Sequence, residues 1–209
     1  MHGPHAMNRL RSRLCCKPVP AIEWTIAAAL LLGSAPGHAE ETPHEAIRAE
    51  YRLKAGFLYN FAKYVEWPAS AFHSAQEPLR LCIFGNEAYT AVRDVLAGKT
   101  VKGRALDIVQ PGNAAEAARC QVVFVSAEYR AGAQAQSMPP GLAASALKVG
   151  ETPDFLHNGG TINLVRSDNR IRFEMRRNST AATPPDLQFS SQLLKLAVLT
   201  DDTRQGGER

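Results

Sequence analysis

The sequence lacks the long apolar run that a transmembrane helix needs. About 20 consecutive apolar residues span a bilayer, whereas the longest such run here, from Trp24 to Ala35, has only about a dozen and is closed by Pro36-Gly37. The chain is 45% hydrophobic and 21% charged, a composition typical of a globular protein with one sizeable core. These features exclude a polytopic membrane protein, a fibrous protein and a disordered chain.

The sequence also lacks the motifs of the common enzyme and metal sites. It has no Gly-x-Ser-x-Gly elbow, no Walker loop and no Gly-x-Gly-x-x-Gly after its first predicted strand. The histidines beyond the first 39 residues are His44, His73 and His157, each isolated from the others, and metal sites need clustered ligands. We therefore predict a non-enzymatic protein without catalytic residues, metal or cofactor.

Positive charge without acidic residues occurs at one end only, in the first 17 residues. An apolar run and then small residues ending at Ala39 follow this basic stretch, which is the pattern of a secretory signal peptide. Glu23 is atypical of such a segment and leaves an uncleaved anchor as the alternative. We expect a cleaved signal peptide at 1–39, a single exported domain at 40–200 and a polar tail at 201–209.

The remainder of the chain has no excess of either charge. Beyond residue 39 there are 20 basic and 19 acidic residues, mixed along the sequence. A nucleic-acid-binding domain normally gathers its basic residues on one face. Nucleic acid is therefore excluded as a predicted partner.

Cysteine is scarce, and two of the four cysteines lie in the predicted signal peptide. Cys82 and Cys120 are the two that remain in the exported domain, where an oxidising compartment favours a disulfide. Closing a loop of this length is worth about 4 kcal/mol in the chain-entropy model. We predict a Cys82–Cys120 disulfide that is either a structural staple or a redox switch.

Helical and extended patterns alternate along the exported domain. Thr42-Pro43 provides a cap and a first-turn proline, and a three-to-four spacing of apolar residues then predicts a helix over 45–66 that ends before Trp67-Pro68. Aromatic residues outside its apolar stripe could pack in the core or meet a partner. The other predicted strands are 79–84, 105–109, 121–125, 146–149, 161–165, 170–175 and 187–189, and the other helical segments are 87–96, 114–119, 128–136, 153–157 and 190–199.

This order of elements predicts one α/β domain. Alternating strands and helices form a mainly parallel sheet flanked by helices. The segments around Ser167-Asp168-Asn169 alternate as two strands of an antiparallel hairpin. The expected fold is therefore a single-domain α/β structure, mainly parallel, with a C-terminal antiparallel hairpin.

Small and capping residues follow three of the predicted strands. They are Gly85 and Asn86, Ser126, and the segment Gly150-Glu151-Thr152. The carboxyl ends of strands in an open α/β sheet line one edge, where crevices bind ligands. This pattern predicts a small-molecule site at Gly85, Asn86 and Ser126, with ordinary helix capping as the alternative.

The run Tyr51-Arg52-Leu53-Lys54-Ala55-Gly56-Phe57-Leu58-Tyr59-Asn60-Phe61-Ala62-Lys63-Tyr64-Val65-Glu66-Trp67-Pro68 resembles the opening signature of the YfiR-like family of small periplasmic proteins. Later segments resemble the family in the same order, so the resemblance covers about residues 45–200. These segments include Leu81–Gly85, Gly98–Arg104, Cys120 before an apolar strand, Gly159–Ile162, Arg172–Glu174 and Ser190–Ala197.

The resemblance implies a periplasmic, non-enzymatic regulator. Such a protein binds the periplasmic sensor part of an inner-membrane diguanylate cyclase and holds the cyclase inactive, which limits cyclic-di-GMP and biofilm formation. Release is linked in the family to an outer-membrane lipoprotein that sequesters the repressor and to reductive misfolding of the repressor. Exposed aromatic residues could serve this partner contact or a homodimer.

The resemblance bears on particular residues as well. Cys82 and Cys120 match a family disulfide pair, whereas the second pair of some members has no counterpart, so redox control through that second pair is excluded. The sequence departs from the family at 178–186, which contains Pro184-Pro185, and at Gly150-Glu151-Thr152, where a Ser-Asp type of ending is usual. The predicted partner-binding residues lie in the later half of the chain and are Phe155, Phe173, Glu174 and Gln192.

Overall fold

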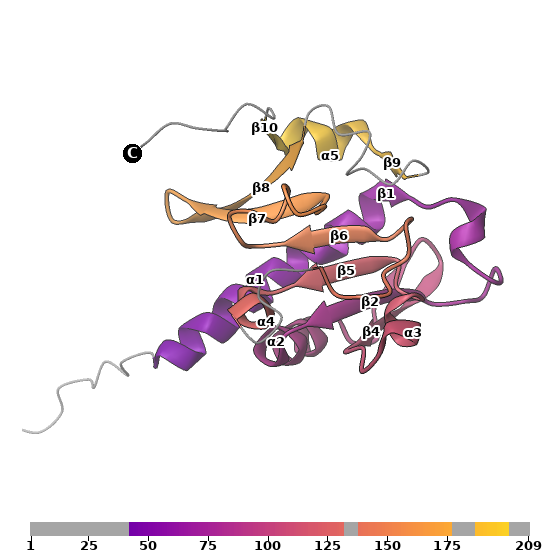
Figure 1. Cartoon of the computed structure of the whole chain (residues 1–209), viewed down its shortest axis with the longest axis horizontal. Helices are drawn as coiled ribbons and strands as arrows, with labels where there is room; N and C mark the ends of the chain where they lie inside the picture. Colours follow the sequence, from indigo (N-terminus) through magenta and orange to yellow (C-terminus); the bar gives the residue numbers. More distant parts are fainter. Residues whose placement is uncertain (1–41, 132–137, 177–186, 201–209) are drawn as a thin grey trace, which may run out of the picture. The chain divides into compact units, whose positions relative to one another are not determined.

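A computed structural model describes residues 42–131, 138–176 and 187–200 (Figure 1). The predicted signal peptide, the tail at 201–209 and the segment at 178–186 lie outside the described residues, as does the end of the helical segment predicted at 128–136. Within the described ranges, no helix combines the length and the apolar character needed to cross a bilayer.

Helices and short strands alternate along these residues. The helices are α1 (Pro43–Tyr64), the 3-10 helix η1 (Ala69–Ala71), α2 (Asn86–Leu96), α3 (Ala114–Ala117), α4 (Ala127–Ala131) and α5 (Ser191–Leu196). The strands are β1 (Val65–Glu66), β2 (Leu79–Phe84), β3 (Thr100–Val101), β4 (Arg104–Val109), β5 (Val122–Val125), β6 (Leu147–Gly150), β7 (Ile162–Ser167), β8 (Arg170–Arg176), β9 (Gln188–Phe189) and β10 (Val198–Thr200).

The main sheet has the strand order β10-β8-β7-β6-β5-β2-β4-β3. Neighbouring strands from β4 through β2, β5 and β6 to β7 are parallel, and β7 and β8 form an antiparallel hairpin. Asp168 and Asn169 turn this hairpin with positive φ angles of 50° and 58°, the conformation that asparagine and aspartate tolerate best. The predicted fold class, a mainly parallel sheet with a C-terminal hairpin, is confirmed.

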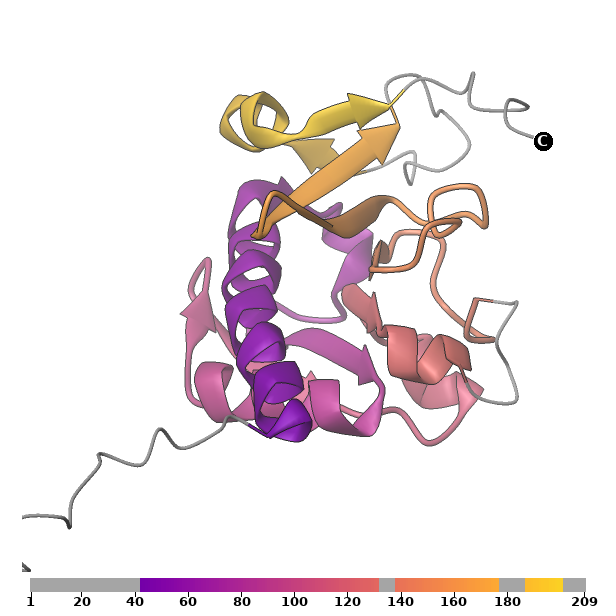
Figure 2. The ribbon, with the colours of Figure 1, turned by 90° about the vertical axis from the view of Figure 1, so that its left-hand side faces the viewer.

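The helix α1 lies across one face of the sheet beside α2 (Figures 1 and 2). The Thr42 side chain caps its first turn by accepting a hydrogen bond from the Glu45 backbone N–H. The buried side of α1 carries Leu58 and Phe61, and the Phe61 ring packs edge-on against Phe173 of β8 at 5.1 Å between centroids. This face holds the larger hydrophobic core.

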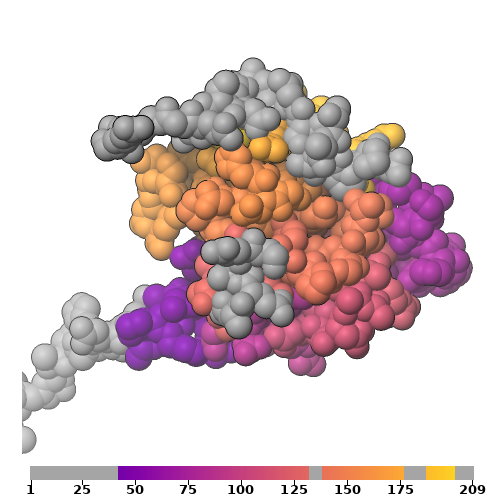
Figure 3. All heavy atoms as spheres, viewed as in Figure 1, coloured from indigo at the N-terminus to yellow at the C-terminus, as the bar shows by residue number. Residues whose placement is uncertain are grey.

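The opposite face of the sheet is covered by α3, α4 and the loops before β6 and β7 (Figures 2 and 3). Successive strand residues alternate between the two faces, so that Cys82 and Val123 belong to this second core while Ile83 and Phe124 belong to the first. Burial on both faces explains why β5 is a continuous apolar run and why β2 is apolar at every position except Arg80.

The ends of the first and the last predicted helices need correction. The helix predicted over 45–66 ends at Tyr64, because Val65 and Glu66 pair antiparallel with β9. The helix predicted over 190–199 ends at Leu196, and Val198–Thr200 instead extends the sheet beside β8. Residues 153–157, for which one helical turn is predicted, form hydrogen-bonded turns. The strand β3, which was not predicted, lies between α2 and β4.

Candidate functional site

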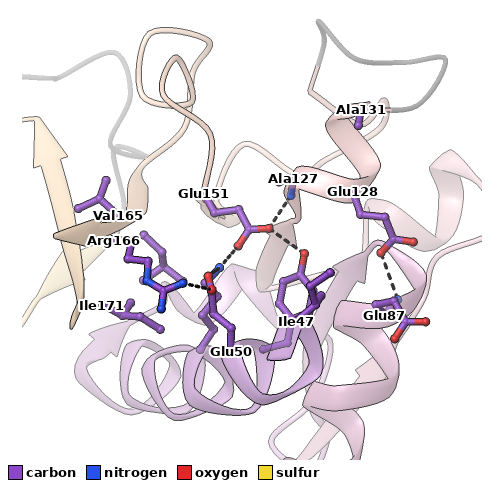
Figure 4. Close-up of a pocket in the computed structure, with 13 residues that line it drawn as sticks. Ile47, Glu50, Glu87, Ala127, Glu128, Ala131, Glu151, Val165, Arg166 and Ile171 are labelled. Carbon is purple, nitrogen blue, oxygen red and sulfur yellow. Dashed lines mark hydrogen bonds and ion pairs between the residues drawn. The ribbon is translucent and has the colours of Figure 1, made fainter. Parts of the chain in front are cut away.

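A cavity of about 610 Å³ lies at the carboxyl-terminal edge of the sheet, where the residues that follow the predicted strands indicate a crevice. One wall is α1 and the other is the β7–β8 hairpin, with the ends of β5 and β6 between them (Figure 4). Apolar and charged side chains alternate around it. The lining includes Ile47, Glu50, Tyr51, Lys54, Glu87, Ala127, Glu128, Glu151, Leu164, Val165, Arg166 and Ile171.

A buried ion pair joins the two sides of this cavity. Lys54 of α1 donates to Glu151, which follows β6, and the two side chains are only 9% and 5% exposed. Lys54 also pairs with Glu50 at 2.5 Å, and Glu50 in turn meets Arg166 of β7 at 3.1 Å. Separating α1 from the strand ends would leave these buried charges uncompensated, which is costly. The four linked charges, from Glu151 to Arg166, therefore hold α1 against the ends of β6 and β7.

The carboxylate of Glu151 is further held by Tyr51 and α4. Its Oε1 atom accepts a hydrogen bond from the Tyr51 hydroxyl at 3.0 Å and another from the Ala127 backbone N–H at 2.5 Å. Burial, together with the negative charge of Glu151, raises the pKa of Tyr51 above its usual value of 10.0. Tyr51 consequently stays a neutral hydrogen-bond donor at physiological pH.

The cavity continues along α1 as a second hollow of about 580 Å³. The two hollows share Ile47, Glu50, Arg166 and Ile171. Leu53 and Phe57 of α1 and Arg170 of β8 line the continuation. We call the combined feature the α1–hairpin groove.

The three predicted ligand-binding residues lie near the cavity but do not line it. Gly85 packs against Ser126, since a Cβ added to Gly85 would lie 2.0 Å from the Ser126 hydroxyl oxygen. Ser126 is fully buried, and its hydroxyl accepts a hydrogen bond from the Tyr129 backbone N–H. Asn86 is exposed and accepts a hydrogen bond from Gln110. The strand ends at Gly85 and Ser126 pack against each other, and ligand binding at these three residues stays a prediction.

The four predicted partner-binding residues divide between core and surface. The Phe155 ring is fully buried against Gly150 and Gly160, where an added Cβ would lie 2.2 Å from it, and Phe173 is only 4% exposed. Glu174 is partly exposed and Gln192 is exposed. The structure therefore makes Phe155 and Phe173 core residues that a partner cannot reach, and partner contact stays a prediction for the other two.

The structure joins Cys82 of β2 to Cys120, which precedes β5, in a disulfide with a Cα–Cα distance of 5.8 Å. Both cysteines are buried, in the core opposite α1. The disulfide connects the α3 turn to the neighbouring strand. Neither cysteine lines the α1–hairpin groove.

No pattern in the sequence identifies Tyr51, Lys54 and Glu151 as a cluster. Lys54 was the available signal, because it falls in the apolar stripe of a predicted helix, where a buried lysine needs an anionic partner. Glu151 is that partner, yet it lies 97 residues away in the sequence. Only the crossing of α1 over the ends of the strands brings the two together.

The groove offers binding chemistry and no evident reaction chemistry. Within the part of the chain that the structure describes, no three histidine, cysteine, aspartate or glutamate side chains gather closely enough to hold a metal ion. The carboxylates of Glu50 and Glu151 are already engaged with Lys54. The site therefore combines apolar area with charges that could orient a bound molecule.

Comparison with known protein families identifies the family of this chain. A search of the curated proteins finds no match. The model of the YfiR/HmsC-like family matches residues 51–198, from the middle of α1 into β10. This match includes the Tyr51–Pro68 segment, both cysteines and Glu151. Proteins of this family are periplasmic regulators and not enzymes. The chain belongs to the YfiR/HmsC-like family.

Proposed function

We propose that this protein is a periplasmic repressor that binds the periplasmic sensor part of an inner-membrane diguanylate cyclase and thereby lowers cyclic-di-GMP synthesis. Family membership over residues 51–198 is the observation that carries this proposal. Envelope or redox signals release the repressor, and an outer-membrane lipoprotein is the candidate antagonist. The signal peptide at 1–39 delivers the protein to the periplasm.

The domain has features that suit a binding protein of the envelope. A disulfide closes the core opposite α1, and oxidising compartments preserve such bonds. Glu174 and Gln192 remain candidate contacts because they lie on the surface. The same surfaces could also support a homodimer.

In-cell crosslinking of the tagged protein, followed by affinity capture and mass spectrometry, tests this function. We expect an inner-membrane protein with a diguanylate cyclase domain in the captured material. An unrelated periplasmic protein with the same tag is the control for non-specific capture. Recovery of the same proteins in both samples would contradict the proposal.

A second candidate function is small-molecule binding in the cavity of about 610 Å³, which has the size of many ligand sites. This candidate predicts a ligand-dependent rise in melting temperature, and Ile171→Glu should reduce the rise because Ile171 lines the cavity. Asn86→Ala is the matched control, since Asn86 does not line it. Equal rises in both variants would count against this candidate.

A further inference from the structure

We propose that the α1–hairpin groove is the docking site for an amphipathic α-helix of a partner protein, with basic residues at one end of that helix and acidic residues at the other. This inference rests on the proposed function and names the surface through which the repressor would bind. The groove has four properties that support this proposal, which are its exposed apolar residues, its length, the opposite charges at its two ends and its rigid base.

The outer side of α1 exposes apolar residues beside a concave surface. Ile47 is 50% exposed and Leu53 is 66% exposed, and both line the groove. Large apolar side chains at this level of exposure, gathered along a hollow, are typical of an interaction site. Ile171 of the hairpin provides apolar surface on the facing wall.

The length of the apolar stripe fits a helix. Ile47 and Phe57 mark its two ends along α1, and ten residues of helix rise about 15 Å at 1.5 Å per residue. A partner helix of about ten residues, or three turns, would cover this distance. Recognition of an apolar helix face by a groove is a recurrent mode of protein binding.

The two ends of the groove carry opposite charges (Figure 4). Glu87 and Glu128 lie at the end next to α2 and α4, while Arg166 and Arg170 lie at the hairpin end. Glu87 is paired with His44 and Arg48, and Arg166 is paired with Glu50. Within the described ranges, neither Glu128 nor Arg170 forms an ion pair, although the Glu128 carboxylate accepts a hydrogen bond from the Glu87 backbone N–H. Glu128 and Arg170 are therefore the charges that a partner would meet at the two ends. Complementary charges at the two ends would fix the direction of a bound helix.

The groove also has a rigid base. The Lys54–Glu151 pair and the Tyr51 hydroxyl tie α1 to the strand ends directly beside the apolar lining. These groups already satisfy one another, so a partner need not supply hydrogen bonds to them. A preformed surface lowers the entropic cost of binding.

Gln192, one of the partner-binding residues predicted from the sequence, lies on a different surface, on α5. Leu196 on α5 is 72% exposed and resembles Leu53 in chemistry, exposure and helical context. A photo-crosslinking amino acid placed at position 53 or at position 196 in the full-length protein therefore compares the two surfaces in cells. We expect the diguanylate cyclase in crosslinks from position 53 and not from position 196.

The affinity between the purified mature domain and the periplasmic domain of the captured cyclase is then measured for substituted variants. Leu53→Asp and Arg170→Glu should each weaken binding about tenfold or more, the effect of removing a central contact. The matched controls Leu196→Asp and Lys195→Glu should leave binding within about twofold. Melting curves of all four variants establish that each is folded.

The outcomes separate the two proposals. Loss of binding with the α5 variants alone, or crosslinks from position 196 alone, would overturn the groove as the docking site and leave the repressor function intact. A lipid or a small molecule crosslinked at position 53 in place of a protein would also overturn it. Failure of the tagged wild-type protein to capture any cyclase would contradict the repressor function itself, and with it the helical partner proposed for the groove.

Discussion

The α1–hairpin groove and the C-terminal surface of α5 and β10 both expose large apolar side chains, but they differ in shape and charge. The groove is hollow, has acidic and basic ends, and lies beside a buried ion pair. The C-terminal surface carries Leu194, Leu196, Val198 and Leu199 on a short helix and on an edge strand. Exposed leucines therefore occur on two surfaces that differ in shape and charge, and shape and charge are what favour the groove as the proposed docking site.

The two regions also differ in how they are held. The groove is built on the 22-residue helix α1, which packs on the main core and is fixed by Lys54. The α5 helix has six residues, and Leu193 is its buried residue. A long helix anchored at several points preserves the geometry of a binding surface better than one anchored at a single leucine.

Loss of the disulfide is the change with the largest expected effect on stability. Cys82→Ala combined with Cys120→Ala should lower the free energy of unfolding by about 4 kcal/mol in the chain-entropy model. Urea unfolding of the oxidised wild type and the variant measures this difference. Because both cysteines lie opposite α1, the folded variant should still bind its partner through the groove. An unchanged unfolding midpoint would show that the disulfide does not constrain the domain.

Removal of the buried carboxylate should have the next largest effect. Glu151→Leu leaves Lys54 with Glu50 as its remaining carboxylate partner, and we expect a loss of about 3 kcal/mol. Glu66→Gln is the control, because its ion pair with Lys102 is exposed and should be worth less than about 1 kcal/mol. Equal losses in the two variants would mean that the buried pair does not stabilise the groove.

Tyr51 should make the stability depend on alkaline pH. Its pKa is raised in the folded state, mainly by burial and then by Glu151, so the folded protein retains a proton that the unfolded chain loses near pH 10. The stabilisation that the protonated Tyr51 provides is complete below pH 10, and it is lost as the pH rises through the folded-state pKa of Tyr51. Tyr51→Phe should cost about 1 kcal/mol at pH 7 and show a smaller decline than wild type above pH 10. Parallel declines would exclude this role of Tyr51.

The exposed leucines should have the smallest effect on stability. Leu53→Asp and Leu196→Asp replace largely exposed side chains, so each should change the free energy of unfolding by no more than about 0.5 kcal/mol. The two variants should then differ in partner binding alone. A large loss of stability in Leu53→Asp would show that this residue supports the fold and not only the groove.

The local elements of the fold were predictable because their signals are local. The cap at Thr42, the apolar runs of β2 and β5 and the Asp168-Asn169 turn each express a short-range preference. The strand β10 was missed because Val198–Thr200 continues an apolar helical pattern. Its pairing with β8 is a long-range contact that overrides that pattern.

The site was only partly predictable, for the same physical reason. The residues Gly85, Ser126 and those after Gly150 indicated the edge of the sheet at which the cavity lies. The sequence did not indicate that Ser126 packs against Gly85, or that Lys54 reaches Glu151. Those contacts depend on the path of α1 across the sheet, which no local pattern encodes.

The most direct test of the account is the intracellular level of cyclic-di-GMP in a strain that lacks this protein. We predict that deletion raises the level, and that the wild type and Leu196→Asp restore it while Leu53→Asp does not. An unchanged level after deletion would contradict repression of a diguanylate cyclase. Restoration by Leu53→Asp as complete as that by wild type would contradict docking at the groove.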